Sequence, residues 1–134
     1  VGLIEGTLRV QDVPEVWNAT IKRYLGLDVP NDAQGCLQDI HWSHGAVAYF
    51  PTYALGNLYA AQLFETIERD IPNLWKNVEA GNFAPLLDWL RDKVHRHGRR
   101  KLAPELLRDV TGATLSSAPF LSYLERKYGE LYRI

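Results

Sequence analysis

The segment Gly35–Phe50 gathers side chains of the kinds that enzymes use for hydrogen bonding and proton transfer. It reads GCLQDIHWSHGAVAYF and holds two histidines, a tryptophan, an aspartate, a glutamine and a tyrosine beside small or apolar neighbours. A polar group that leaves water costs on the order of 1–3 kcal/mol unless it is paired. These side chains therefore either satisfy one another within the fold or line a site where a ligand completes the pairing.

Tyr49 and His41 are the two side chains of this segment that suit catalysis best. A tyrosine hydroxyl or a protonated histidine can donate a hydrogen bond to a developing oxyanion. With Tyr53, they flank a glycine-containing turn that leads into a predicted helix, and catalytic residues are often placed on loops held by a rigid scaffold. The residues alone leave a second interpretation open, an aromatic core segment whose hydroxyls bond backbone carbonyls.

Metal or nucleophile chemistry finds little support in the same segment. His41 and His44 are three residues apart and could share a helix face, but Asp39 is the only acid nearby. Zinc sites use three or four protein ligands, so we predict no metal site in this chain. Cys36 has no polarising surroundings that would pair it with His41 as a nucleophile. The chain also lacks P-loop, GxGxxG and GxSxG motifs.

Charge and hydropathy argue against nucleic-acid and membrane partners. The 134 residues carry 15 basic and 16 acidic side chains, so no overall field attracts either surface. The basic run at 95–101, HRHGRRK, follows a predicted helix end, where cations interact favourably with the helix dipole. No apolar run approaches the roughly 18 residues of a spanning helix, and no signal-peptide pattern opens the chain. The single cysteine, Cys36, fits a reducing, cytoplasmic setting.

Helix signals recur along the chain and strand alternation is almost missing. Prolines in first turns, glycines at helix ends and apolar residues at spacings of three and four predict an all-α fold. Asp12 is a candidate cap for the first helix, and Asn31 with Gln34 resembles a capping box for the second. We predict one helical domain over 1–134, with helices at about 14–26, 32–40, 51–70, 73–81, 85–97, 104–111 and 119–132.

The stretch Gly35–Trp42 matches a family signature, GxxQDxHW, position by position. This signature resembles that of the thermostable carboxypeptidase (carboxypeptidase Taq) family of metallopeptidases. The similarity continues through SHGAVAYFPTYALGNLYAAQLFE and DWLRDKVHRHGRR to the tail YLERKYGELY, so that it covers essentially the whole chain.

The resemblance implies a hydrolase of known type. Members of this family are mostly helical, homodimeric metalloproteases that remove single residues from peptide C-termini. They hold a divalent metal, zinc or cobalt, with the histidines of an HExxH helix and a downstream glutamate. Neither HExxH nor the family's IRxxAD motif occurs in these 134 residues, and there is no methionine. We therefore expect a C-terminal fragment of an enzyme about four times longer, inactive by itself.

The resemblance also implies roles for particular residues. In the wider group of helical HExxH peptidases, a histidine and a tyrosine eight residues later supply hydrogen bonds to substrate and oxyanion. His41 and Tyr49 have this spacing and are the expected catalytic donors. The expected substrate-binding residues are Gln38, His44 and Tyr53. Asp39 and Trp42 are expected to orient His41 and shape the cleft wall.

A second function class stays open for the chain itself. It could be a non-catalytic helical domain that associates with itself or with another protein. A piece of a larger core should expose apolar surface, which promotes association. We therefore expect a homo-oligomer, formed as a dimer or by exchanged helices.

Overall fold

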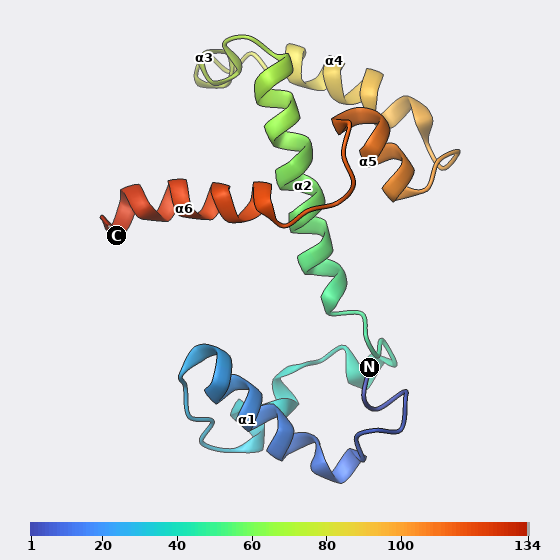
Figure 1. The fold of residues 1–134 in the computed structure, drawn as a ribbon, viewed down its shortest axis with the longest axis vertical. Helices are drawn as coiled ribbons and strands as arrows, with labels where there is room; N and C mark the ends of the chain where they lie inside the picture. Colours follow the sequence, from blue (N-terminus) through green and yellow to red (C-terminus); the bar gives the residue numbers. More distant parts are fainter. Residues whose placement is uncertain (134) are drawn as a thin grey trace. The chain divides into compact units, whose positions relative to one another are not determined.

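The computed structural model describes residues 1–133, and every regular element among them is helical. Six α-helices follow one another along the chain (Figure 1). They are α1 (Val13–Leu25), α2 (Pro51–Asp70), α3 (Leu74–Glu79), α4 (Ala84–Lys93), α5 (Ala103–Thr111) and α6 (Ala118–Tyr132). Short 3₁₀ turns occupy Val10–Asp12, Asp32–Gln34, Cys36–Gln38, Trp42–His44 and His95–His97. The predicted all-α class is confirmed.

The chain divides into two compact units, Val1–Pro51 and the part that begins at Thr52. The first unit contains α1 and the polar segment, and the second contains nearly all of α2 and everything that follows it. The prediction of one domain over 1–134 stays a prediction.

The ends of α1 follow the sequence signals closely, with one difference. Gly26 stops the helix in the left-handed region, with φ of 72°, and its N–H donates to the carbonyl of Lys22. Asp12 does precede the helix, but its carboxylate accepts hydrogen bonds from Arg9 at 2.7 and 2.9 Å and makes no cap bond. The predicted Asp12 cap is therefore replaced by a local ion pair.

The prediction of a helix at 32–40 is wrong, because the structure has no α-helix there. Two 3₁₀ turns, Asp32–Gln34 and Cys36–Gln38, take its place, although Asn31 Oδ1 does accept from the N–H of Gln34 at 3.0 Å. Gly35 separates the turns with φ of −119° and ψ of −121°, outside the helical region. A Cβ at this position would lie 2.7 Å from Val29 Cγ1, so close packing against the preceding loop requires glycine here.

The helix predicted at 85–97 is shorter in the structure. α4 ends at Lys93, Val94 leaves helical geometry, and a 3₁₀ turn covers His95–His97. Arg100 donates to the carbonyls of Arg96 and His97 at 2.9 and 3.3 Å. A cationic side chain thus satisfies carbonyls that the helix end leaves without an intrahelical partner.

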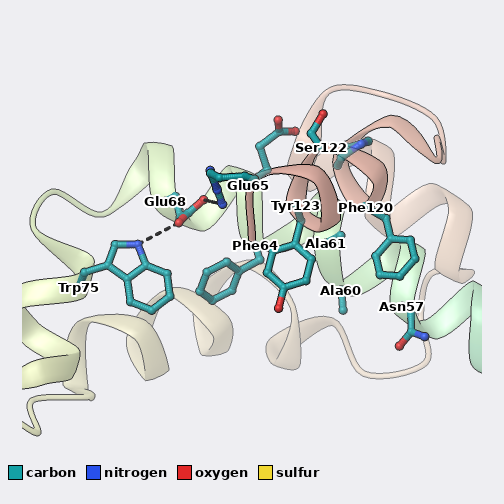
Figure 2. A pocket seen from close by; sticks show the side chains of 12 residues that line it. Asn57, Ala60, Ala61, Phe64, Glu65, Glu68, Trp75, Phe120, Ser122 and Tyr123 are labelled. Carbon is teal, nitrogen blue, oxygen red and sulfur yellow. Dashed lines mark hydrogen bonds and ion pairs between the residues drawn. The ribbon is translucent and has the colours of Figure 1, made fainter. Parts of the chain in front are cut away.

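The second unit has its core at the C-terminal end of α2. Ile67, Ile71, Leu74 and Trp89 are buried together there, and Trp89 Nε1 donates to Asp70 at 3.1 Å. In Figure 1, α3 and α4 lie at that end of α2, while α6 begins nearer its middle. A cavity of about 420 Å³ opens between α2 and α6 (Figure 2).

The chain exposes more surface than a closed fold of its mass. Its accessible surface is 10,355 Å². A compact monomer of this mass would expose about 7,100 Å², and two separate compact bodies of the two units' lengths about 8,600 Å² together. The excess is on the order of 1,800 Å², about twice the area of roughly 800 Å² that one partner contributes to a standard protein–protein interface.

Candidate functional site

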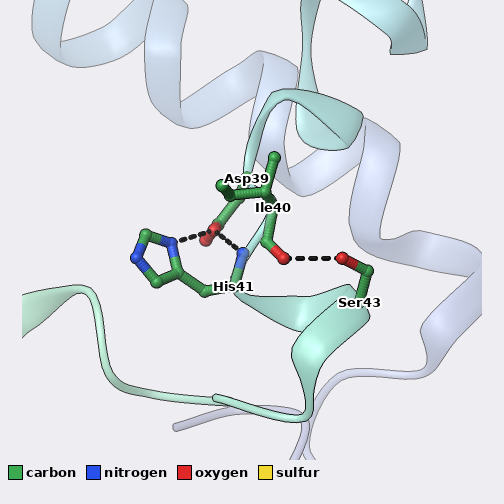
Figure 3. Close-up of polar contacts among 4 residues, drawn as sticks. All are labelled: Asp39, Ile40, His41 and Ser43. Atoms are coloured by element: carbon green, nitrogen blue, oxygen red, sulfur yellow. Dashed lines mark hydrogen bonds and ion pairs between the residues drawn. The ribbon is translucent and has the colours of Figure 1, made fainter.

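A tight turn shapes the polar segment around His41. The carbonyl of His41 accepts hydrogen bonds from the N–H groups of Ala46 at 2.9 Å and His44 at 3.2 Å. Gly45 permits the reversal because it adopts a φ of 71°, which a side chain would disfavour. Just before the turn, Ser43 Oγ donates to the carbonyl of Ile40 at 2.7 Å (Figure 3). The backbone on both sides of His41 is therefore held by local hydrogen bonds.

Asp39 binds His41 through one oxygen. Asp39 Oδ1 accepts from the backbone N–H of His41 at 2.9 Å and lies 2.7 Å from His41 Nδ1 (Figure 3). An ionised carboxylate can only accept, so His41 Nδ1 carries the proton of this hydrogen bond. The side chains of Asp39 and His41 are 9% and 22% exposed. The aspartate thus fixes both the orientation and the tautomer of the ring.

The electrostatics of the pair favour the charged aspartate. Burial raises the pKa of Asp39. The hydrogen bonds from the backbone and ring of His41, together with the charge of that ring, lower it by more than burial raises it. The net effect is a pKa below the usual aspartate value. Asp39 is therefore an acceptor at neutral pH and does not serve as a proton donor.

Two aromatic rings lie beside His41. Its ring centroid is 5.7 Å from that of Tyr49, tilted by 31°, and 5.5 Å from that of Phe50, edge to face at 82°. Ala48 precedes them with a φ of 63°, an unusual conformation for a residue with a Cβ. The structure thus brings together Asp39, His41 and Tyr49 of the predicted site residues. Phe50 was not predicted, although its position next to Tyr49 in an aromatic segment was a usable signal.

The other predicted site residues have separate surroundings. Gln38 Nε2 donates to the carbonyl of Ala33 at 2.5 Å, so this amide ties the two 3₁₀ turns together. Trp42 packs edge to face on Trp17 of α1, with ring centroids 6.3 Å apart. His44 is exposed in the turn. Tyr53 lies in the first turn of α2, in the second unit, and is 52% exposed.

Trp17 also escaped prediction as a neighbour of the site. Its only sequence signal was a place on the apolar face of the first helix. It lines an apolar cavity of about 300 Å³ in the first unit together with Trp42. α1 therefore supports the polar segment through the contact between Trp17 and Trp42.

Residues that could hold a metal ion do not come together in the part of the chain that the structure describes. Across residues 1–133, no group of three or more His, Cys, Asp or Glu side chains has the proximity a metal site needs. The described residues thus form no complete zinc-type donor set, because zinc sites use three or four protein ligands.

The basic run at 95–101 is engaged locally. Arg96 pairs with Asp92 one turn earlier, and Lys101 Nζ lies 2.5 Å from Asp109 of α5. Burial, with the cations of Lys101, Arg96 and Arg100, lowers the pKa of His97. These contacts agree with the interpretation of a solvated helix end. None of the helices among the described residues combines the length and apolarity required to cross a membrane.

Comparison with known proteins gives a consistent result. The family model described as carboxypeptidase Taq (M32) metallopeptidase matches residues 1–128. Carboxypeptidase 1 of Bacillus subtilis is 42% identical over 130 residues, which are 97% of this chain and 26% of that protein. Thermostable carboxypeptidase 1 of Thermus thermophilus is 42% identical over 132 residues, again 26% of its length. The chain therefore spans about a quarter of the curated relatives that it matches.

Solved structures show the same relationship. The M32 carboxypeptidase of Deinococcus radiodurans R1 is 40% identical, with a TM-score of 0.93 over 99% of this chain and 27% of its own. Metallocarboxypeptidase 1 of Trypanosoma cruzi is also 40% identical, with a TM-score of 0.88 over 95% of this chain and 26% of its own. The signature around His41, the helical fold and these matches agree, and the chain belongs to the carboxypeptidase Taq (M32) family of metallopeptidases.

Proposed function

We propose that this chain is the C-terminal part of a metal-dependent carboxypeptidase that removes single residues from peptide C-termini. Its contribution is the wall of the active-site cleft that carries His41 and Tyr49. The observation that supports this best is the Asp39–His41 pair beside the Tyr49 ring, within the GxxQDxHW signature of a chain that belongs to this family.

Tyr49 and His41 divide the hydrogen-bonding work in this proposal. Attack of water on a peptide carbonyl places negative charge on the carbonyl oxygen, and the hydroxyl of Tyr49 donates to that oxygen. His41, held through Nδ1 by Asp39, presents Nε2 to the peptide backbone of the substrate. A fixed ring loses little entropy when the substrate binds, which favours the reacting geometry.

The remaining predicted residues bind the substrate or support the cleft wall in this proposal. Gln38, His44 and Tyr53 contact the peptide substrate, and Trp42 holds its position through Trp17. The divalent metal of the intact enzyme, zinc or cobalt, is held by residues outside this chain, since the described residues form no complete zinc-type donor set. The 134 residues by themselves are inactive, and the intact enzyme works as a homodimer in the cytoplasm.

A chimera tests the assignment of Tyr49. The matching 26% of Bacillus subtilis carboxypeptidase 1 is replaced by this chain, at 42% identity. Release of the C-terminal residue from a blocked dipeptide is then measured with added Co²⁺ or Zn²⁺ and a chelator control. Tyr49→Phe is expected to lower kcat by about 10²–10³, the usual cost of removing one oxyanion donor.

Two controls make the result interpretable. Tyr132→Phe removes the same hydroxyl from an exposed position in α6 and should leave kcat unchanged. The 134-residue chain alone should show no chelator-sensitive turnover. Undiminished kcat in an active Tyr49→Phe chimera would contradict the role of Tyr49, and stoichiometric metal with turnover in the isolated chain would contradict the placement of the metal.

A second function is favoured by one observation, the excess exposed surface. A non-catalytic helical domain for self-association would also expose apolar faces, with large hydrophobic residues such as Leu102, Leu131 and Tyr132 at the surface. The chimera separates the two proposals, because a domain used only for association has no reason to need the hydroxyl of Tyr49.

A further inference from the structure

Phe50 is a neighbour of His41 for which the proposed reaction has no task. Its ring centroid lies 5.5 Å from that of His41 with the two planes at 82°, an edge-to-face arrangement that aromatic rings favour. Both residues belong to the first compact unit. Phe50 is 60% exposed, so a substitution at this position does not open a packed core. The position of this ring against the histidine therefore calls for a reason other than core packing.

The backbone before Phe50 directs two consecutive aromatic rings to one histidine. Side chains of consecutive residues in an extended chain point to opposite sides, yet the rings of Tyr49 and Phe50 lie 5.7 and 5.5 Å from that of His41. The N–H of Tyr49 donates to the carbonyl of Ala46 at 3.3 Å, which closes a turn with Ala48 at its third position. Ala48 has a φ of 63°, where glycine or asparagine is usual. The chain thus keeps a strained residue at the point where it brings both rings to His41.

A hydrogen bond at one nitrogen leaves an imidazole ring one freedom. Asp39 Oδ1 lies 2.7 Å from Nδ1 and orients the ring through that atom, but the ring plane can still tilt about this hydrogen bond. The last torsion of a histidine side chain is broad, so covalent geometry restrains the tilt only weakly. The ring of Tyr49 is inclined at 31° to the imidazole and that of Phe50 at 82°. These two contacts therefore restrain the ring plane that Asp39 leaves free.

We propose that Phe50 is a positioning residue, whose edge-to-face contact holds the imidazole plane of His41 in the orientation that meets the peptide substrate. One aromatic pair is strong enough to change the ratio of held to free orientations by about three- to tenfold. A ring that is held beforehand loses less entropy when the substrate binds. The inference rests on the proposed function for the task of His41, whereas the ring contact belongs to this chain alone.

The first test measures the orientation of His41 in the 134-residue chain. Nuclear Overhauser effects (NOEs) between the ring protons of His41 and Tyr49 report it, after the four histidines and the tyrosines have been labelled with ¹³C. Phe50→Leu removes the ring but keeps an apolar side chain, and we expect these NOEs to weaken. Phe50→Tyr keeps the ring and should keep the NOEs. Phe83→Leu makes the first change at a residue of the second unit that is 56% exposed, and should leave the NOEs unchanged.

The second test asks whether Phe50 acts through His41. In the chimera described above, Phe50→Leu should lower kcat/KM by about three- to tenfold, the value of one aromatic pair. Phe50→Tyr should restore it, and Phe83→Leu should not change it. In a chimera that already carries His41→Ala, Phe50→Leu should have no further effect, because the ring that it positions is gone.

Several results would overturn the proposal. NOEs that persist in Phe50→Leu would show that His41 is held without this ring. An equal loss of kcat/KM with and without His41, or a loss that Phe50→Tyr does not restore, would assign Phe50 a task other than positioning His41. Failure of the proposed function looks different. An active chimera with undiminished kcat in Tyr49→Phe contradicts that function and leaves the NOE result standing, whereas unchanged NOEs contradict only the role of Phe50.

Discussion

Asp39 carries its charge in a place where burial alone would oppose ionisation. Its side chain is 9% exposed, yet the backbone N–H and ring of His41 lower its pKa below the usual value. A carboxyl group whose pKa is lowered in the folded state stabilises the fold above its unfolded pKa, about 3.9. That stabilisation is lost as the pH falls through the lowered pKa of the folded state.

The substitution Asp39→Asn tests this linkage. We predict a loss of stability around His41 at neutral pH, and a difference from the unsubstituted chain that shrinks as the pH falls through the lowered pKa of Asp39. Urea unfolding followed by NMR signals of residues 39–50 measures it over a pH series. Asp88→Asn, at an exposed position with its ion-pair partner 3.7 Å away, is the control. A difference that does not vary with pH would show that the charge of Asp39 is not what holds the turn.

Contacts close in sequence made part of the site predictable at the level of residues. Asp39 and His41 are two residues apart, and the glycine of the turn follows at Gly45, so their proximity follows from local geometry. Trp17 and Trp42 meet across 25 positions of sequence, and no local pattern states which face of α1 the tryptophan of the signature contacts. The first kind of contact could be predicted, and the second required the tertiary fold.

At the scale of elements, helix ends that depend on local sequence could be predicted, whereas those set by tertiary packing could not. Gly26 and Gly112 end α1 and α5 in left-handed conformations, and both helices were predicted from proline and glycine signals. The segment at 32–40 failed because the close approach of Val29 to Gly35 is a packing constraint that helix periodicity does not carry. Propensity and capping thus predict elements well where no neighbour overrides them.

Gln62 connects α2 to the loop between α5 and α6. It is 4% exposed, its Nε2 donates to the carbonyl of Thr114 at 3.0 Å and to Thr111 Oγ1 at 3.3 Å, and its Oε1 accepts from the N–H of Ser116 at 3.0 Å. One amide thus uses both of its ends on a loop about 50 positions later in the chain. Such a contact gives no signal in the sequence of α2.

The substitution Gln62→Leu should destabilise the second unit. We predict a loss of about 1–2 kcal/mol in the free energy of unfolding, because the three hydrogen bonds of the Gln62 amide disappear while the exposed partners Thr114 and Ser116 can turn to water. Urea denaturation measures it, with Gln11→Leu at an exposed position as control. Amide exchange at Ser116 should also become faster. Unchanged protection of Ser116 would mean that the loop does not depend on this amide.

At the scale of the whole molecule, the surface decides how the chain behaves in solution. Its 10,355 Å² of accessible surface exceeds the area expected for two closed bodies by about twice what one partner contributes to a standard interface. Leu55, Trp75 and Tyr123 are among the large hydrophobic residues exposed on α2, α3 and α6. Apolar surface exposed to water is unfavourable in free energy, and association removes that surface from water.

We therefore predict that the isolated chain associates with itself when no partner covers these faces. Light scattering over a concentration series should give a mass above 15.3 kDa that rises with concentration. High salt provides the control, because association by apolar contact persists in salt whereas association by exposed charges weakens. A single species of 15.3 kDa at every concentration would contradict the prediction. Such a monomer would mean that the exposed apolar faces do not drive self-association.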